Sequence, residues 1–249
     1  MDHHPESVGI IGCGRLGRLL AELLERDFTV RVYDRDPRRI SGHAGATTLA
    51  GAAGADVVML AVPVRELSGV LAAVTPYLRP GAVVLETGAV KVLPARLLRR
   101  LPAGVAALPL HPLFGPSSLG DRPAGQTVVL CPIRRTPPAV ARFWESYWNN
   151  RGFRVVRTSP SAHDRVMART LVLTQWLGRA CASLAAGEPP FAAPSWEHLR
   201  ALMDTAAGDD WVTFADLQTC NPYARAERGR LRSEMARLER ELRDNPAIG

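Results

Sequence analysis

Long apolar runs are missing from this chain of 249 residues: no stretch could cross a bilayer, and the first residues, MDHHPES, are polar with no apolar segment after them. Cysteine is also scarce. The four cysteines show neither a CxxC pair nor a metal-ligand spacing, which argues against a disulfide framework and against a metal site. With 47% hydrophobic residues, the chain can form one large globular domain or two smaller ones. We therefore expect a cytoplasmic globular protein with reduced cysteines.

Lysine is nearly absent, because Lys91 is the one lysine among 31 basic residues. A net charge of +7 could indicate nucleic-acid binding, so the distribution of the charged residues along the chain matters more than their sum. The arginines are spread over the chain and alternate with acidic residues, as in RAERGRLRSEMARLERELRD (225–244), a pattern typical of a solvated helix face. We expect no nucleic-acid partner. The positive excess suits small anionic ligands.

Residues 7–158 alternate short β-branched runs with amphipathic segments. Helices are predicted between strands, for example over Arg15–Arg26 and Val92–Leu101, which indicates βαβ units and a mainly parallel sheet. The predicted strands are SVGII (7–11), TVRVY (29–33), DVVMLAV (56–62), AVVLET (82–87), VAALPL (105–110), TVVLC (127–131) and FRVVR (153–157).

Beyond residue 158 the pattern becomes helical. Ser159–Gly187 is predicted to form one long helix, PPFAAPS breaks it, and three further helices follow. We expect the last helix to have Asn221 as its N-cap and Pro222 at its first position. An apolar stripe on that helix needs a surface to pack against; it consists of Leu231, Met235, Leu238 and Leu242.

The first predicted strand leads directly into Gly12, Gly14 and Gly17, a GxGxxG pattern at the head of a helix. Here the glycines allow a tight turn, close approach of a pyrophosphate and close helix packing, and the helix start binds phosphates. The second strand ends at Asp34, whose carboxylate would bind an adenosine ribose and repel a 2′-phosphate, so NAD is favoured over NADP. Arg35 beside it could soften that preference. The predicted cofactor site also includes Cys13, Arg15 and Leu16.

Other strands end at the same rim of the predicted sheet, where ligands of such sheets bind. Val62 and Pro63 follow the third strand, Thr87 ends the fourth, and His111 follows the fifth. The sequence therefore predicts an α/β protein: a Rossmann-type, mainly parallel sheet domain over residues 1–158 and an all-helical domain over 159–249.

Three stretches together resemble the prephenate and arogenate dehydrogenase family: ETGAVK (86–91), LHPLFGP (110–116) and AHDRVMARTLVLTQWLGRA (162–180). They follow, in order, the family's Asp-x-Gly/Ala-Ser-Val-Lys, His-Pro-Met-Phe-Gly-Pro and Glu-His-Asp elements. The resemblance implies an NAD-dependent oxidative decarboxylation of a cyclohexadiene carboxylic acid, in which hydride leaves ring C4 and the ring carboxylate leaves as CO2. It also implies a homodimer formed through the helical domain.

The resemblance implies that His111 accepts the C4 hydroxyl proton, a task that suits an imidazole with an ordinary pKa of about 6.5. Lys91 matches the motif lysine, and two interpretations stay open: a catalytic group, or a cation at a helix start with no role. His163 and Asp164 open the long predicted helix, where we expect Asp164 to cap free amides.

Three substrate-binding positions depart from the family pattern. Ala89 stands where the family has a serine on the C4 hydroxyl, and Gln175 where it has a histidine. Thr205 takes the place of the arginine that clamps a carboxylate, a loss that Arg200 or Arg225 could offset.

Two substrate assignments stay open. The substrate is either prephenate bound through other residues, or an analogue with an amine: arogenate, with the amine on its side chain, or 4-amino-4-deoxyprephenate, with the amine at C4. Ala89 slightly favours the last.

Two other classes of protein stay open. One is an NAD-binding pseudoenzyme or regulator. The other is a β-hydroxyacid or imine reductase, although the hydroxyacid enzymes usually carry a catalytic lysine in a helical domain that here has none.

Overall fold

The computed structural model describes residues 4–115, 119, 125–184, 187, 189–208 and 210–244. Pro116, at the end of the LHPLFGP stretch, and residues 185 and 186 of the long predicted helix lie outside these ranges. The chain divides into two compact units, Met1–His163 and Asp164–Gly249, where the sequence suggested a boundary at residue 158. None of the four cysteines forms a disulfide bond.

The first unit is built on a seven-stranded sheet in the order β2-β1-β3-β4-β5-β6-β7. All neighbouring pairs are parallel except β5 and β6, which are antiparallel, so the predicted α/β class with a mainly parallel sheet is confirmed. Each predicted run forms its strand; the bounds are β1 Ser7–Ile11, β2 Thr29–Tyr33, β3 Val57–Leu60, β4 Val83–Glu86, β5 Ala106–Pro112, β6 Thr127–Leu130 and β7 Arg154–Arg157.

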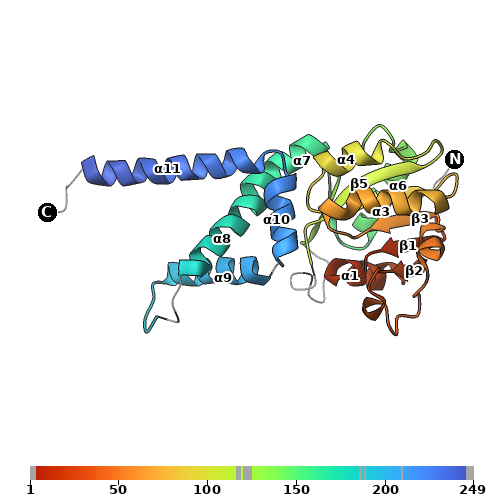
Figure 1. Cartoon of the computed structure of the whole chain (residues 1–249), viewed down its shortest axis with the longest axis horizontal. Helices are drawn as coiled ribbons and strands as arrows, with labels where there is room; N and C mark the ends of the chain where they lie inside the picture. Colours follow the sequence, from red (N-terminus) through yellow and green to blue (C-terminus); the bar gives the residue numbers. More distant parts are fainter. Residues whose placement is uncertain are drawn as a thin grey trace. The chain divides into compact units, whose positions relative to one another are not determined.

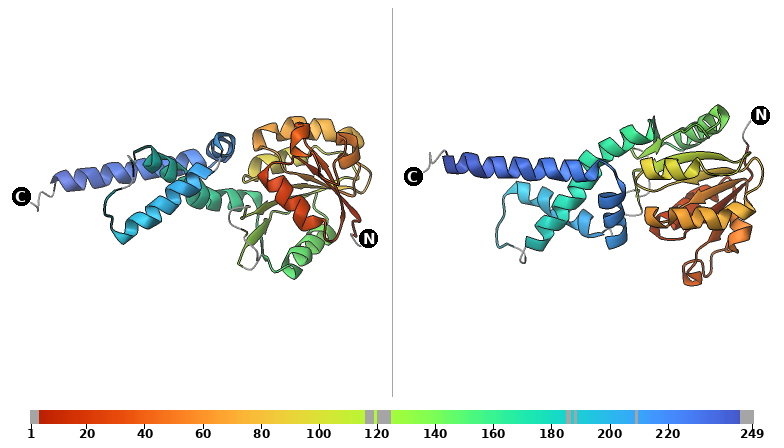
Figure 2. Two further views of the ribbon diagram at one scale, coloured as in Figure 1. Left: turned by 90° about the horizontal axis from the view of Figure 1, so that it is seen from below. Right: turned by 45° about the horizontal axis from the view of Figure 1, so that its top comes forward.

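Helices cover both faces of this sheet (Figures 1 and 2). One core cluster packs α1 (Arg15–Leu24) and α6 (Pro138–Asn150) on one face, and includes the fully buried Leu20, Leu24, Trp144 and Trp148. The other packs α2 (Leu49–Ala53), α3 (Leu67–Val74) and α4 (Val92–Leu98) on the opposite face. Each fully buried large apolar side chain contributes roughly 1.5–3 kcal/mol to folding. The 3-10 turns described in this unit are η1 Pro37–Arg39, η2 Val64–Glu66 and η3 Thr75–Tyr77.

The long helical pattern after residue 158 begins with α7 (Pro160–Met167), passes through a π-helical turn, η4 (Ala168–Val172), and ends with α8 (Leu173–Leu184). The prediction that Asp164 caps this helix is wrong. Ser159 caps it, because its Oγ accepts a hydrogen bond from the amide of Ala162 (3.2 Å), whereas Asp164 lies inside the helix and is buried.

Three further helices complete the second unit: α9 (Pro194–Gly208), α10 (Trp211–Cys220) and α11 (Ala224–Asp244). The predicted start of the last helix is wrong. Asn221 Oδ1 accepts the amide of Tyr223 (2.9 Å) in a turn that holds Pro222, and the helix begins only at Ala224.

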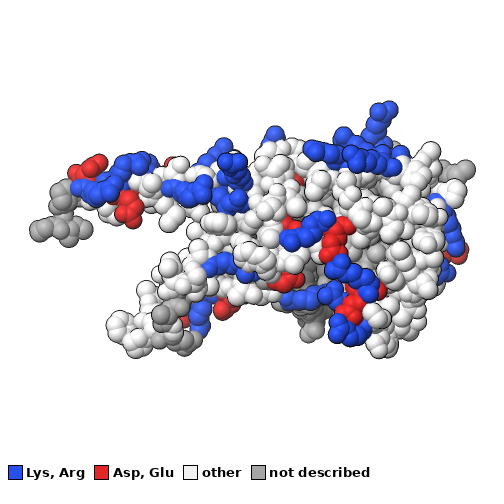
Figure 3. Space-filling model, in the orientation of Figure 1, with Lys and Arg blue, Asp and Glu red and all other residues white. Residues whose placement is uncertain are grey.

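The outer part of α11 extends beyond the other helices of its unit (Figure 1). Along it, Met235, Leu238 and Leu242 are 55%, 51% and 74% exposed, so most of the predicted stripe is uncovered in a single chain. Basic side chains on the drawn face lie over both units with acidic ones among them (Figure 3). No helix in the described part of the chain is long and apolar enough to cross a membrane.

Candidate functional site

The glycine-rich loop joins β1 to α1 in a tightly packed turn. Gly12 has φ +98°, a conformation that favours glycine, and a Cβ at Gly17 would lie 1.9 Å from the Gly12 carbonyl oxygen. Above Gly14 there is room instead, since a Cβ there would meet only Arg39 Nη1, at 3.9 Å. Helix α1 begins at Arg15 with no acidic residue in its first turn. The loop therefore has the shape and polarity to receive a phosphate group.

Asp34 is fixed at the end of β2 and faces this loop. Its Oδ2 accepts the amide of Cys13 (2.7 Å) and its Oδ1 accepts the amide of Asp36 (2.8 Å), and the residue is 7% exposed. These bonds hold the carboxylate in one orientation while leaving lone pairs for further donors.

The cation beside Asp34 is Arg39. Its Nη1 lies 3.7 Å from Asp34 Oδ2. The neighbouring Arg35, which the sequence singled out, turns away to an exposed ion pair with Glu66 (3.0 Å). Sequence reasoning missed Arg39 because the turn η1, which carries it back toward the loop, is not evident from hydrophobic pattern.

Thr87 ties two strands together at the rim. It is 1% exposed, and both its amide (3.2 Å) and its hydroxyl (3.0 Å) donate to the carbonyl of Leu60. At the same carboxyl edge of the sheet, after β3 and β4, Val62 and Ala89 are partly exposed and Pro63 is exposed.

Lys91 is fully buried and forms an ion pair within the loop that follows β4. Its Nζ lies 2.6 Å from Glu86 Oε2 and 3.3 Å from the Glu86 carbonyl oxygen, and the amide of Gly88 donates to Glu86 Oε1 (2.6 Å). The single lysine of the chain is the N-cap residue of α4, but its side chain is not solvated. It neutralises a buried carboxylate.

His111 lies near the end of β5 and touches a second imidazole. It is 7% exposed, and its Nδ1 is 2.9 Å from Nε2 of His163, which is 2% exposed. Burial, the neighbouring His163 and the charge of Lys91 hold the pKa of His111 well below its ordinary value. At neutral pH the ring is therefore an uncharged base.

His163 is the residue of this site whose contact the sequence reasoning missed. The sequence places it at the opening of the long helix, in the stretch that resembles the Glu-His-Asp element, but does not link it to His111. The one feature of the sequence that pointed to a contact with the site was the position of this histidine, in the first turn of the helix that follows the last strand of the sheet.

The predicted substrate-binding residues of the second unit differ in exposure. Gln175 on α8 is 3% exposed, whereas Thr205 on α9 and Arg225 on α11 are exposed. Thr205 donates its hydroxyl to the carbonyl of Ala201 (2.7 Å). Arg228, one turn after Arg225, donates to the carbonyl oxygen (2.9 Å) and to Oε1 (2.6 Å) of Gln218.

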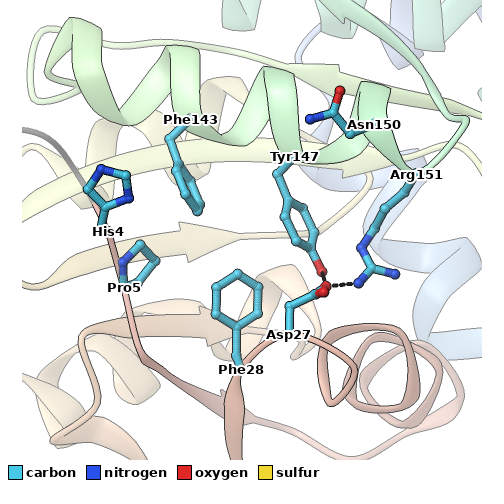
Figure 4. A pocket seen from close by; sticks show the side chains of 8 residues that line it. All are labelled: His4, Pro5, Asp27, Phe28, Phe143, Tyr147, Asn150 and Arg151. Carbon is cyan, nitrogen blue, oxygen red and sulfur yellow. Dashed lines mark hydrogen bonds and ion pairs between the residues drawn. The ribbon is translucent and has the colours of Figure 1, made fainter.

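A hollow of about 550 Å³ lies elsewhere, near the amino ends of β1 and β2 (Figure 4). Asp27 accepts the hydroxyl of Tyr147 (2.9 Å) and pairs with Arg151, whose guanidinium stacks on the Tyr147 ring. These contacts fasten α6 to the turn after α1. The other lining residues are His4, Pro5, Phe28, Phe143 and Asn150, so none of the predicted site residues faces this hollow.

Within the ranges that the structure describes, no group of three or more His, Cys, Asp or Glu side chains could hold a metal ion. The candidate site consists of a glycine-rich loop, a fixed carboxylate, a buried ion pair and a buried pair of histidines.

Residues 24–157 match the family model of the prephenate dehydrogenase nucleotide-binding domain. The chain is 32% identical over 253 residues to a 4-amino-4-deoxyprephenate dehydrogenase of Streptomyces pristinaespiralis, covering 91% of this chain and 81% of that protein. It is 30% identical over 185 residues to a cyclohexadienyl dehydrogenase of Zymomonas mobilis (66% and 61%) and 26% identical over 236 residues to a probable arogenate/prephenate dehydrogenase of Methanocaldococcus jannaschii (87% and 52%). The matched chain thus spans about half to three fifths of the length of the last two proteins.

Among solved structures, a prephenate dehydrogenase from A. aeolicus in complex with hydroxyphenyl propionate and NAD+ has the same fold. The TM-score is 0.80 at 21% identity, over 99% of this chain and 93% of that one. A Synechocystis arogenate dehydrogenase gives a TM-score of 0.71 at 19% identity, over 97% and 93%.

Proposed function

The chain belongs to the prephenate dehydrogenase family, and we propose that it catalyses the NAD-dependent oxidative decarboxylation of prephenate or a close analogue to a 4-substituted phenylpyruvate. The observation that carries the proposal is the buried His111, in contact with His163 at the carboxyl edge of the sheet, the edge that also holds the glycine loop and Asp34. Open sheets of this kind bind their ligands at that edge.

The cofactor site consists of the glycine loop, Asp34 and the rim residues after β3 and β4. The loop fits a dinucleotide because it is closed beneath Gly12 and Gly17 and open above Gly14. When bound, NAD supplies the hydride acceptor. The residues assigned to it are Gly12, Cys13, Gly14, Arg15, Leu16, Gly17, Asp34, Arg35, Val62, Pro63 and Thr87.

His111 handles the proton of the reaction. Its free ring nitrogen takes the proton of the C4 hydroxyl as hydride leaves C4, and the ring carbon becomes a carbonyl carbon. The bond to the ring carboxylate then breaks, CO2 departs, and its electron pair completes the aromatic ring. The resulting phenolate oxygen takes the proton back from His111, which restores the base.

Asp34 should set the choice of cofactor. In Asp34→Ser, the charge that repels a 2′-phosphate is gone and Arg39 is released to pair with that phosphate. The ratio of kcat/KM for NAD to that for NADP should fall by about tenfold or more, which corresponds to about 1.4 kcal/mol. Steady-state kinetics with both nucleotides measure it. Asp36→Ser, whose side chain bonds Arg38, is the matched control, and an unchanged ratio in Asp34→Ser would remove Asp34 from this role.

The substrate with an amine at C4 is favoured over its hydroxyl counterpart. Ala89 lacks a hydroxyl that could bond the C4 oxygen, and the relative from Streptomyces pristinaespiralis is a 4-amino-4-deoxyprephenate dehydrogenase. We assign Ala89 and His111 to substrate binding. The assignments of Gln175, Thr205 and Arg225, which belong to the second unit, stay predictions from the sequence. With the amine substrate, His111 takes a proton from the C4 nitrogen instead.

The protein should be incubated with NAD and, separately, with prephenate, arogenate and 4-amino-4-deoxyprephenate, while the absorbance of NADH is followed. We expect turnover with the highest kcat/KM for 4-amino-4-deoxyprephenate. A clear preference for prephenate would overturn the C4 amine assignment. If the protein bound NAD but converted none of the three acids, the proposal that it is an enzyme would be wrong, and a role as an NAD-binding regulator would be supported.

A homodimer formed through the helical unit is the expected assembly, in the cytoplasm as the sequence suggests. The support is the exposed stripe of Met235, Leu238 and Leu242, since a contiguous apolar helix face is usually covered by a partner. Light scattering should give twice the mass of the 27.0 kDa chain, and Leu238→Glu should halve that value. A monomeric wild type would contradict the proposal.

A further inference from the structure

The buried contact between His111 and His163 restricts where the proton on each ring can lie. The two nitrogens are 2.9 Å apart, and the ring planes are inclined at 66°. A contact of this length between two imidazole nitrogens needs one donor and one acceptor. Either Nδ1 of His111 or Nε2 of His163 must therefore carry a hydrogen that points at the other nitrogen.

Only one of the two arrangements leaves His111 able to act as a base. If Nδ1 of His111 donates to Nε2 of His163, the Nε2 atom of His111 keeps its lone pair. If His163 donates instead, the hydrogen of neutral His111 sits on Nε2, and that atom cannot accept a proton. The first arrangement also persists after His111 becomes protonated, because the imidazolium still donates to a neutral partner.

We propose that His163 is a positioning residue that holds His111 in its Nδ1–H tautomer and thereby presents Nε2 of His111 as the atom that takes the substrate proton. This inference rests on the proposed function for its catalytic meaning. The tautomer itself is a property of the free protein.

The fold holds His163 firmly in place for this task. Ser159 caps α7, and the amide of His163 donates to the Ser159 carbonyl oxygen (2.9 Å) in the first turn. The ring is 2% exposed, so water does not compete for its nitrogen.

The charged groups around His111 favour its neutral form. Lys91, at the start of α4, and His163, on α7, both oppose a positive charge on His111, and Glu86 offsets part of the charge of Lys91. A second proton on the pair would place two cations in contact, which burial makes costly.

The test is nitrogen NMR of the protein with 15N-labelled histidine, without cofactor or substrate. The chain has six histidines, and the signals of His111 are assigned as those that vanish in His111→Asn. We expect Nδ1 of His111 to be protonated and Nε2 to be unprotonated at neutral pH. A hydrogen on Nε2 in the wild type would overturn the inference outright, whatever the variants do.

Two variants separate positioning from packing. His163→Phe keeps a ring of similar size but removes the acceptor, and should shift His111 toward the Nε2–H tautomer. His163→Gln supplies an amide oxygen near the position of Nε2 and should retain Nδ1–H. An unchanged tautomer in a folded His163→Phe protein would contradict the proposal, and circular dichroism checks the fold of each variant.

Turnover gives the second readout. kcat should fall at least about tenfold in His163→Phe with KM little changed, a smaller loss than removal of the base itself, and His163→Gln should recover most of it. A wild-type protein that has the expected tautomer but converts none of the three acids would refute the proposed function and leave the positioning role intact. Equal kcat in the wild type and His163→Phe would refute the catalytic meaning of the contact.

Discussion

Replacing His111 by asparagine should lower kcat by a factor of roughly 10² to 10⁴, the usual contribution of a positioned general base. The carboxamide is similar in size and polarity but cannot take a proton at neutral pH. The Kd for NAD should stay unchanged, because the glycine loop and Asp34 belong to other strand ends. Initial rates of NADH formation and a titration with NAD measure the two quantities.

The matched control for this prediction is His198→Asn, since His198 is an exposed histidine on α9. Its kcat should equal that of the wild type. Turnover of His111→Asn within a few fold of the wild type would exclude His111 as the proton acceptor, even if the protein proved to be a dehydrogenase.

Replacing Lys91 by methionine should lower the free energy of unfolding by about 3–5 kcal/mol, because the Glu86 carboxylate would be left buried without its partner. Lys91 is fully buried, and the Glu86 side chain is 3% exposed. Urea denaturation followed by circular dichroism gives the difference. The double variant Glu86→Gln/Lys91→Met should recover much of the loss, because neither buried charge remains.

The exposed pair of Arg35 and Glu66 is the control for Lys91. Arg35→Met should change the free energy of unfolding by no more than about 1 kcal/mol, as is usual for a surface ion pair. An equally small loss in Lys91→Met would contradict a stabilising role. The folded double variant also decides between the two interpretations of Lys91: kcat near the wild-type value assigns it to structure, and a large loss assigns it to catalysis.

The strands and the glycine loop could be predicted because their causes are local. Short apolar runs, most of them rich in β-branched residues, coincide with β1 to β7, and the spacing of Gly12, Gly14 and Gly17 reflects contacts within one turn. The location of His111 near the end of a strand could be predicted, because it directly follows the apolar run VAALPL. In each case the pattern and the structural requirement lie within a few residues of each other.

The sequence predictions failed where a contact joins residues far apart in the chain, or where two nearby side chains could each cap the same helix. His163 follows His111 by 52 positions, so no local pattern links the two rings. Asp164 has the chemistry of a helix cap, but Ser159 takes that task and the carboxylate becomes buried. Asn221 closes a turn rather than starting α11, because its side chain bonds the nearer amide of Tyr223.

The pH dependence of kcat, compared between the wild type and His111→Asn, tests the central claim most directly. Burial, His163 and Lys91 lower the pKa of His111, so its neutral form persists as the pH falls below the ordinary imidazole value. We predict that wild-type kcat is constant through neutral pH and declines only below about 6.5, and that the residual rate of His111→Asn lacks this decline. An identical acid decline in both proteins would show that another group takes the proton.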